Sequence, residues 1–119
     1  MIMNSNTNIM RGKVYWADLG KYNGHVQGGV RPVIIIQNDV GNEHSPTTIV
    51  VPCSTTRKIA TPCHYYFTLN GNYTIALCEQ ILTINKNQLK GYITSLDNKQ
   101  MKILSSKICR SLGYEREKI

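Results

Sequence analysis

Short hydrophobic blocks separated by polar turns occupy most of the first eighty residues of the chain. Blocks of this length, rich in Val, Ile, Thr and aromatic residues, are typical of β-strands. An Asn70-Gly71-Asn72 turn joins two of the blocks into a hairpin. The pattern predicts strands at 13–18, 32–37, 47–53, 64–69 and 73–78, polar loops at 19–29, 38–46 and 54–62, and an extension of the last pairing at 81–84.

The C-terminal part of the chain changes to helical spacing. Asp97 is suited to be an N-cap, with Gln100 three residues later as in a capping box. Hydrophobic residues then recur at helical intervals up to Gly113, which ends the helix, and they are Met101, Leu104, Ile108 and Leu112. We expect this stripe to pack on the sheet rather than on a membrane or a partner, and we expect a short helical turn at 85–90. The chain is predicted to be mainly β, a small, partly open β-barrel of the SH3-like type with helical additions.

Length and composition fit one globular domain. The 119 residues are 41% hydrophobic, which excludes a disordered chain. Residues 1–9 are Asn-rich and without periodicity, so we expect a flexible extension there and a single domain over 10–119. The sequence contains no stretch long enough to span a membrane, and the polar N-terminus lacks an apolar export segment. A cytoplasmic location is therefore expected.

Charge and cysteine usage narrow the function classes. Fourteen Lys and Arg against seven Asp and Glu give a net charge of +7, which favours a polyanionic partner, although scattered charge often serves only solubility. The four cysteines never approach CxxC spacing, and the three histidines do not cluster with them. We expect no metal site and no cofactor.

One arginine has a setting that suggests chemistry. Arg31 follows a Gly28-Gly29 loop and stands at the mouth of an apolar strand with three consecutive isoleucines. Guanidinium offers a planar fork of donors that matches phosphate oxygens and keeps its charge. The alternative is a strand-end arginine paired with a surface carboxylate.

Six short motifs follow one another along the chain: 11–19 (RGKVYWADL), 27–32 (QGGVRP), 37–42 (QNDVGN), 45–47 (SPT), 79–81 (EQI) and 111–113 (SLG). In this order they resemble the MazF/PemK toxins, which are sequence-specific, metal-independent endoribonucleases of toxin–antitoxin modules. The resemblance covers residues 10–113 and departs from the family at Leu82, where many members have Arg.

This resemblance implies a PemK/CcdB-like barrel, a homodimer and a MazE-like antitoxin as partner. It also implies a catalytic pair of Arg31 and Ser54, with Thr55 and Thr56 directly following as alternative hydroxyls. Single-stranded RNA carries its own nucleophile, the 2′-OH, so such an enzyme has to orient the phosphate and stabilise charge on its oxygens. The expected products are a 2′,3′-cyclic phosphate and a 5′-OH end.

Further RNA contacts are expected from loop and strand-end residues. Each has a plainer interpretation: a loop histidine or a loop pair of cations is often only solvated, and a carboxylate–amide pair can simply end a strand. Tyr65, Tyr66 and Tyr73 can stack on bases, but aromatic strand residues more often belong to the core or an interface, as we expect for Trp16. His64 is expected to be structural. The predicted RNA-binding residues are Asn23, His25, Gln27, Thr55, Thr56, Arg57, Lys58, Glu79 and Gln80.

Two other function classes fit the same sequence. One is a CcdB-like toxin that binds DNA gyrase and has no nuclease activity, and the other is a non-catalytic nucleic-acid-binding module. Arg31 and the hydroxyls at 54–56 favour the nuclease, because a gyrase poison needs neither.

Overall fold

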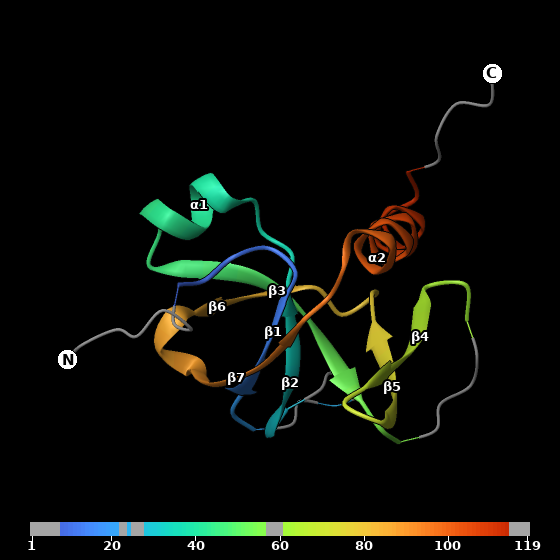
Figure 1. The fold of residues 1–119 in the computed structure, drawn as a ribbon, viewed down its shortest axis with the longest axis horizontal. Coiled ribbons are helices and arrows are strands. Elements are labelled where there is room, and N and C mark those ends of the chain that lie inside the picture. The colour runs from blue at the N-terminus through green and yellow to red at the C-terminus, as the bar shows by residue number, and fades with distance from the viewer. Residues whose placement is uncertain (1–7, 22–23, 25–27, 57–60, 115–119) are drawn as a thin grey trace.

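The computed structural model describes residues 8–21, 24, 28–56 and 61–114 (Figure 1). Seven strands, two α-helices and one 3-10 helix make up this part of the chain. In chain order they are β1 (Lys13–Asp18), β2 (Val30–Ile35), α1 (Asp39–His44), β3 (Thr47–Ser54), β4 (His64–Leu69), β5 (Asn72–Leu77), β6 (Leu82–Asn85), η2 (Lys86–Gln88), β7 (Leu89–Ser95) and α2 (Asn98–Ser111).

All strand pairs are antiparallel, and the sheet is ordered β4-β5-β3-β2-β1-β7 with β6 also on β3. Strand β3 is the shared element. One side of it pairs with β2, whereas the other side pairs first with β6 and then, at Cys53 and Ser54, with β5. The strands β1, β2, β6 and β7 with the first part of β3 curl into a half-barrel, and β4 and β5 extend from it as a hairpin (Figure 1). The predicted mainly β, partly open barrel with a C-terminal helix is confirmed.

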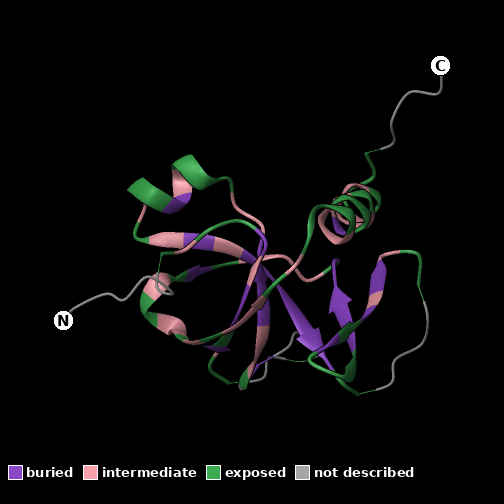
Figure 2. Cartoon of the chain, in the orientation of Figure 1, coloured by how far each residue is buried: buried purple, intermediate pink, exposed green. Residues whose placement is uncertain are grey.

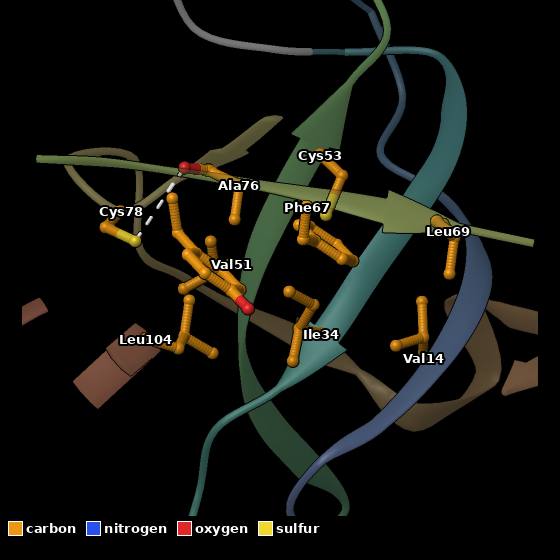
Figure 3. Packing of buried hydrophobic residues seen from close by; sticks show 10 residues of the cluster. Val14, Ile34, Val51, Cys53, Phe67, Leu69, Ala76, Cys78 and Leu104 are labelled. Carbon is orange, nitrogen blue, oxygen red and sulfur yellow. Dashed lines mark hydrogen bonds between the residues drawn. The ribbon is translucent and has the colours of Figure 1, made fainter. Parts of the chain in front are cut away.

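Two hydrophobic clusters lie on opposite faces of this sheet. The first joins Leu104 of α2 to side chains of β1 to β5, among them Ile34, Val51, Cys53 and Phe67 (Figure 3). The second is built from the half-barrel strands alone: Tyr15, Ala17, Val33, Ile35, Val50 and Ile84. Since successive residues of a strand point to opposite faces, β2 and β3 contribute to both clusters in alternation.

Helix α2 covers the first cluster as predicted. The Asp97 carboxylate accepts a hydrogen bond from Gln100 N at 2.8 Å, and the Gln100 side chain accepts one from Asp97 N at 2.9 Å, so the capping box is present. Leu104 is fully buried, and Met101 and Ile108 pack beside it. The outward side of the helix is exposed (Figure 2).

Two local predictions were wrong, and a third was right only in part. The expected turn at 38–46 contains α1, which begins because the Asn38 side chain accepts from Gly41 N at 2.8 Å. Segment 81–84 does not extend the hairpin: β6 pairs with β3, since both edges of β5 are already occupied. The helical turn at 85–90 shrinks to η2 and is followed by β7, a strand missing from the prediction.

The predicted strand at 32–37 is observed two residues earlier, as β2. Its ladder stops at Ile35 because Ile36 N and Gln37 N both donate to one acceptor, Ile49 O, at 2.9 and 3.2 Å. In the described part of the chain, none of the helices has the length and apolar composition needed to cross a membrane. Residues 1–7 of the predicted N-terminal extension lie outside the described residues.

Candidate active site

Arg31 is the second residue of β2, opposite Ala17 of β1, and its side chain is half-buried. The preceding loop closes through a hydrogen bond from Leu19 N to Gly29 O at 2.9 Å, and Gly29 has a φ of +72°, which favours glycine. The guanidinium donates from Nε to Gly28 O at 2.8 Å and from Nη1 to Cys53 O at 3.2 Å. Two carbonyls from different segments therefore fix the plane of the guanidinium.

Ser54 is the last residue of β3. The β2–β3 register pairs Val33 with Pro52, and continuing it by two residues brings Ser54 opposite Arg31. The side chain is 4% exposed, and its Oγ accepts a hydrogen bond from Thr56 N at 3.1 Å. The accepting oxygen keeps its own O–H as a donor. The arrangement combines a fixed cation and a hydroxyl on the same face of the sheet.

Thr55 and Thr56 differ from Ser54 in exposure and in their position relative to the end of β3. Both side chains are exposed, and Thr55 follows the end of the strand, so it does not continue the ladder beside Arg31. Thr56 contributes its main-chain N–H to Ser54. Among these three hydroxyls, Ser54 is therefore the one that the β2–β3 register brings beside Arg31.

Cys53, the residue directly before Ser54, points to the opposite face of the sheet and is fully buried. Burial raises the pKa of its thiol, Cys78 nearby adds to the increase, and Arg31 lowers it only in part. Burial likewise raises the pKa of Cys78 to about 12. Both thiols are thus protonated near neutral pH and neither offers a thiolate nucleophile.

Glu79 follows β5, and its side chain is 42% exposed. Its Oε2 lies 3.1 Å from Nε2 of His64, the first residue of β4, whose side chain is buried. Gln80 is half-buried, and its N–H donates to Leu77 O at 2.9 Å. The structure therefore brings Glu79 to His64, a contact that the sequence did not predict.

The sequence left base stacking, the core and an interface open for two tyrosines of the hairpin, and the structure takes them out of the buried core. Tyr73 is 55% exposed and Tyr66 is half-buried. Their rings are stacked, with centroids 6.1 Å apart and planes 19° from parallel. The signal that separates them from the core is alternation, because Tyr66 stands between Tyr65 and Phe67, whose side chains both face the buried cluster.

Five predicted RNA-binding residues lie outside the described residues: Asn23, His25, Gln27, Arg57 and Lys58. In the rest of the chain, which the structure does describe, no three His, Cys, Asp or Glu side chains converge as a metal site would require.

The fold and the sequence both have close counterparts. Residues 10–112 match the family described as PemK-like, MazF-like toxin of type II toxin-antitoxin system. The Endoribonuclease MazF of Staphylococcus saprophyticus is 44% identical over 110 residues, covering 88% of this chain and 92% of the relative.

Solved structures share the fold at lower identity. A mycobacterial endoribonuclease, solved in complex with its cognate antitoxin, superposes with a TM-score of 0.78 at 24% identity and covers 92% of this chain and 99% of its own. MazF from Deinococcus radiodurans gives a TM-score of 0.77 at 17% identity, with 88% and 96% covered.

The curled sheet, its C-terminal helix and the match over 103 residues of the domain define a toxin of toxin–antitoxin systems. The chain belongs to the PemK-like, MazF-like toxin family, and within it the similarity is to the MazF endoribonucleases. It is thus an endoribonuclease toxin.

Proposed function

We propose that this toxin cleaves single-stranded RNA at a short sequence by attack of the substrate's own 2′-OH on the adjacent phosphate. The O2′–P bond forms as the P–O5′ bond breaks, the 2′-OH gives its proton to water, and the leaving 5′ oxygen takes a proton from water. The products are a 2′,3′-cyclic phosphate and a 5′-OH end. Arg31 stabilises negative charge on the non-bridging oxygens through its fork of donors, and Ser54 adds one hydrogen bond. In this mechanism the protein supplies neither a nucleophile nor a metal ion.

The observation that carries the proposal is the anchoring of Arg31 by a carbonyl of the loop before β2 and a carbonyl of β3. Ser54 lies opposite Arg31 when the β2–β3 register is continued by two residues. A donor fork that is held in place before substrate binds loses little free energy to reorganisation when charge develops. The protonated state of Cys53 and Cys78 also fits a reaction in which the substrate brings its own nucleophile.

The proposed assembly is a cytoplasmic homodimer inhibited by a MazE-like antitoxin. A protomer of net charge +7 doubles its charge in a dimer and attracts flexible polyanions, both RNA and acidic peptides. The antitoxin's acidic segment is proposed to compete with RNA. Displacement of labelled, uncleavable RNA by such a peptide, followed by anisotropy, tests this, and unchanged RNA affinity at saturating peptide would contradict it.

End chemistry tests the reaction itself. Purified protein is incubated with a long RNA in EDTA, and the fragments are sequenced after direct 5′ phosphorylation by a kinase. We expect cuts at one short motif, 5′ ends that accept phosphate and 3′ ends that resist ligation until the cyclic phosphate is removed. Fragments bearing 5′-phosphate, or dependence of cleavage on a divalent ion, would refute the proposed mechanism. Uncut RNA with inhibited DNA gyrase would indicate the CcdB-like alternative.

A further inference from the structure

We propose that Tyr66 and Tyr73 form a stacking platform for one base of the RNA substrate, beside the Arg31–Ser54 pair, and that His64 and Glu79 position Tyr66. This inference rests on the proposed function, since it assigns a base subsite to the same site.

The strand registers bring these residues to one face. Ser54 of β3 pairs with Ile75 of β5, and Ile75 pairs with Tyr66 of β4. Paired residues in antiparallel strands point to the same side of a sheet. Tyr73, two residues before Ile75, shares that side as well. A single row therefore leads from the proposed catalytic hydroxyl to the tyrosine pair.

The distance along this row allows one RNA strand to contact both Ser54 and the tyrosine pair. Neighbouring strands are about 4.8 Å apart, so Tyr66 stands roughly 10 Å from Ser54, across β5. A base on the tyrosines would belong to a nucleotide near the scissile phosphate rather than to a remote part of the strand. Its contact can therefore contribute to the choice of cleavage site.

The hairpin carries two stacked aromatic pairs, and they differ in exposure. Tyr65 and Phe67 are stacked at 5.1 Å and 3° and are both buried in the cluster under α2. Tyr66 and Tyr73 are stacked at 6.1 Å on the other face, where Tyr73 is 55% exposed. Nucleobases stack on aromatic rings with little regard to sequence. An exposed tyrosine on the same sheet as a fixed arginine, in a basic protein, fits this ligand.

A polar chain through the buried His64 side chain holds Tyr66 in place. His64 is 4% exposed, and Nε2 lies 3.1 Å from Glu79 Oε2 while Nδ1 lies 3.5 Å from the Tyr66 hydroxyl, at the outer limit of a hydrogen bond. One tautomer satisfies both contacts: Nε2–H donates to the carboxylate, and Nδ1 accepts from the tyrosine. The imidazole edge also meets the Tyr66 ring at 74° with centroids 6.1 Å apart.

The experiment compares tyrosine variants on RNA made uncleavable by 2′-O-methylation at the scissile nucleotide. Tyr73→Ala is expected to weaken binding about tenfold by anisotropy, and Tyr73→Phe to restore it, because stacking needs the ring and not the hydroxyl. Tyr114→Ala is the matched control, since Tyr114 is 63% exposed beyond α2 and outside this face. Its affinity should equal that of the unmodified protein.

A spectroscopic readout locates the base. 2-Aminopurine is substituted at each position of the cleavage motif, and stacking on the tyrosines should quench its fluorescence at one position only. Tyr73→Ala should remove that quenching. Tyr66→Phe, which loses the contact to His64, is expected to raise KM while leaving kcat within about twofold.

Two results would overturn the inference. The first is wild-type RNA affinity and position-independent quenching in Tyr73→Ala. The second is a shift in oligomeric state by sedimentation with unchanged RNA affinity of the remaining dimer, which would make the pair an interface between copies. If only the tyrosine platform is wrong, the unmodified protein still cleaves RNA at the motif while either of these results is seen. If the unmodified protein does not cleave RNA, the proposed function itself is refuted.

Discussion

The two faces of the β3–β5–β4 sheet are built from the same strands and serve different ends. One face carries Cys53 and Phe67, packs against Leu104 of α2 and is closed to solvent. The opposite face carries Ser54, which is buried, and Tyr73, which is 55% exposed, and we call it the open face because of this exposed tyrosine. Cys53 and Ser54 are adjacent and point to opposite faces, so substitutions one residue apart should separate stability from the proposed catalytic role.

The sharpest test of the open face is Arg31→Ala. Loss of a fixed charged donor is expected to slow cleavage by about 10²–10³-fold, equal to about 3–4 kcal/mol of transition-state stabilisation. Thermal unfolding should change little, and single-turnover cleavage with melting curves measures both. Arg31→Lys should also be poor, because a point charge cannot reproduce the fork. Arg110→Ala, an exposed arginine of α2, is the control, and wild-type cleavage by Arg31→Ala would remove Arg31 from the site.

Leu104→Ala is the corresponding test of the covered face. Leu104 is fully buried, so its truncation should cost about 3 kcal/mol of unfolding free energy, within the usual 2–5 kcal/mol range. Cleavage per folded molecule should be retained at a temperature where the variant is folded. Ile103→Ala, on the exposed side of the same helix, should lie within about 0.5 kcal/mol of the parent protein in chemical denaturation.

Ser54→Ala should show a smaller effect on the open face. Loss of one neutral hydrogen bond is expected to slow cleavage about tenfold, and Ser54→Thr, which keeps the hydroxyl, should retain most activity. Thr55→Ala should be milder than Ser54→Ala in the same single-turnover assay. If instead Thr55→Ala cripples the enzyme and Ser54→Ala is neutral, the register assigned to the site is off by one residue.

Asp97→Ala should have the smallest effect, and only on the covered face. The carboxylate caps α2 by accepting from Gln100 N, and replacing such a cap typically costs about 1 kcal/mol. Asp97→Asn, which can still accept this bond, should recover most of the loss in chemical denaturation. A change in cleavage by folded Asp97→Ala would show that the two faces are coupled.

The parts of the fold that sequence predicted are those with strong local signals. The capping box at Asp97 and the period of the α2 stripe lie within a few residues of one another and need no tertiary information. Strands β1, β3, β4 and β5 are dense in buried hydrophobic residues, so their position is also a local property.

The missed elements depend on partners distant in sequence. Strand β7 is an edge strand without a fully buried residue, and Gly91 interrupts it opposite Trp16, so its hydrophobic pattern is weak. The partner of β6 is decided by which edges of the sheet are already occupied. Trp16 was expected in the core or at an interface. Its side chain is 46% exposed in the protomer, so it is not in the core and only the interface remains as a prediction.

In the candidate site, too, residues with local sequence signals were predicted and contacts between distant residues were not. Arg31 and Ser54 could be proposed from family motifs because each is marked by its neighbours in sequence. The contact between His64 and Glu79 could not, since it joins the start of one strand to the end of its hairpin partner. The open faces of Tyr66 and Tyr73 follow from alternation only once the buried side of β4 is known.

The pairing of the first strand with β7 also has a consequence for folding. Lys13 of β1 pairs with Ser95 of β7, so the sheet that supports Arg31 is complete only when two distant parts of the chain have met. Contacts between such distant residues must first overcome a large loop-closure entropy, and this slows folding. A chain that has not yet paired these two strands contains Arg31 and Ser54 without holding them in place, so the proposed active site forms late in folding.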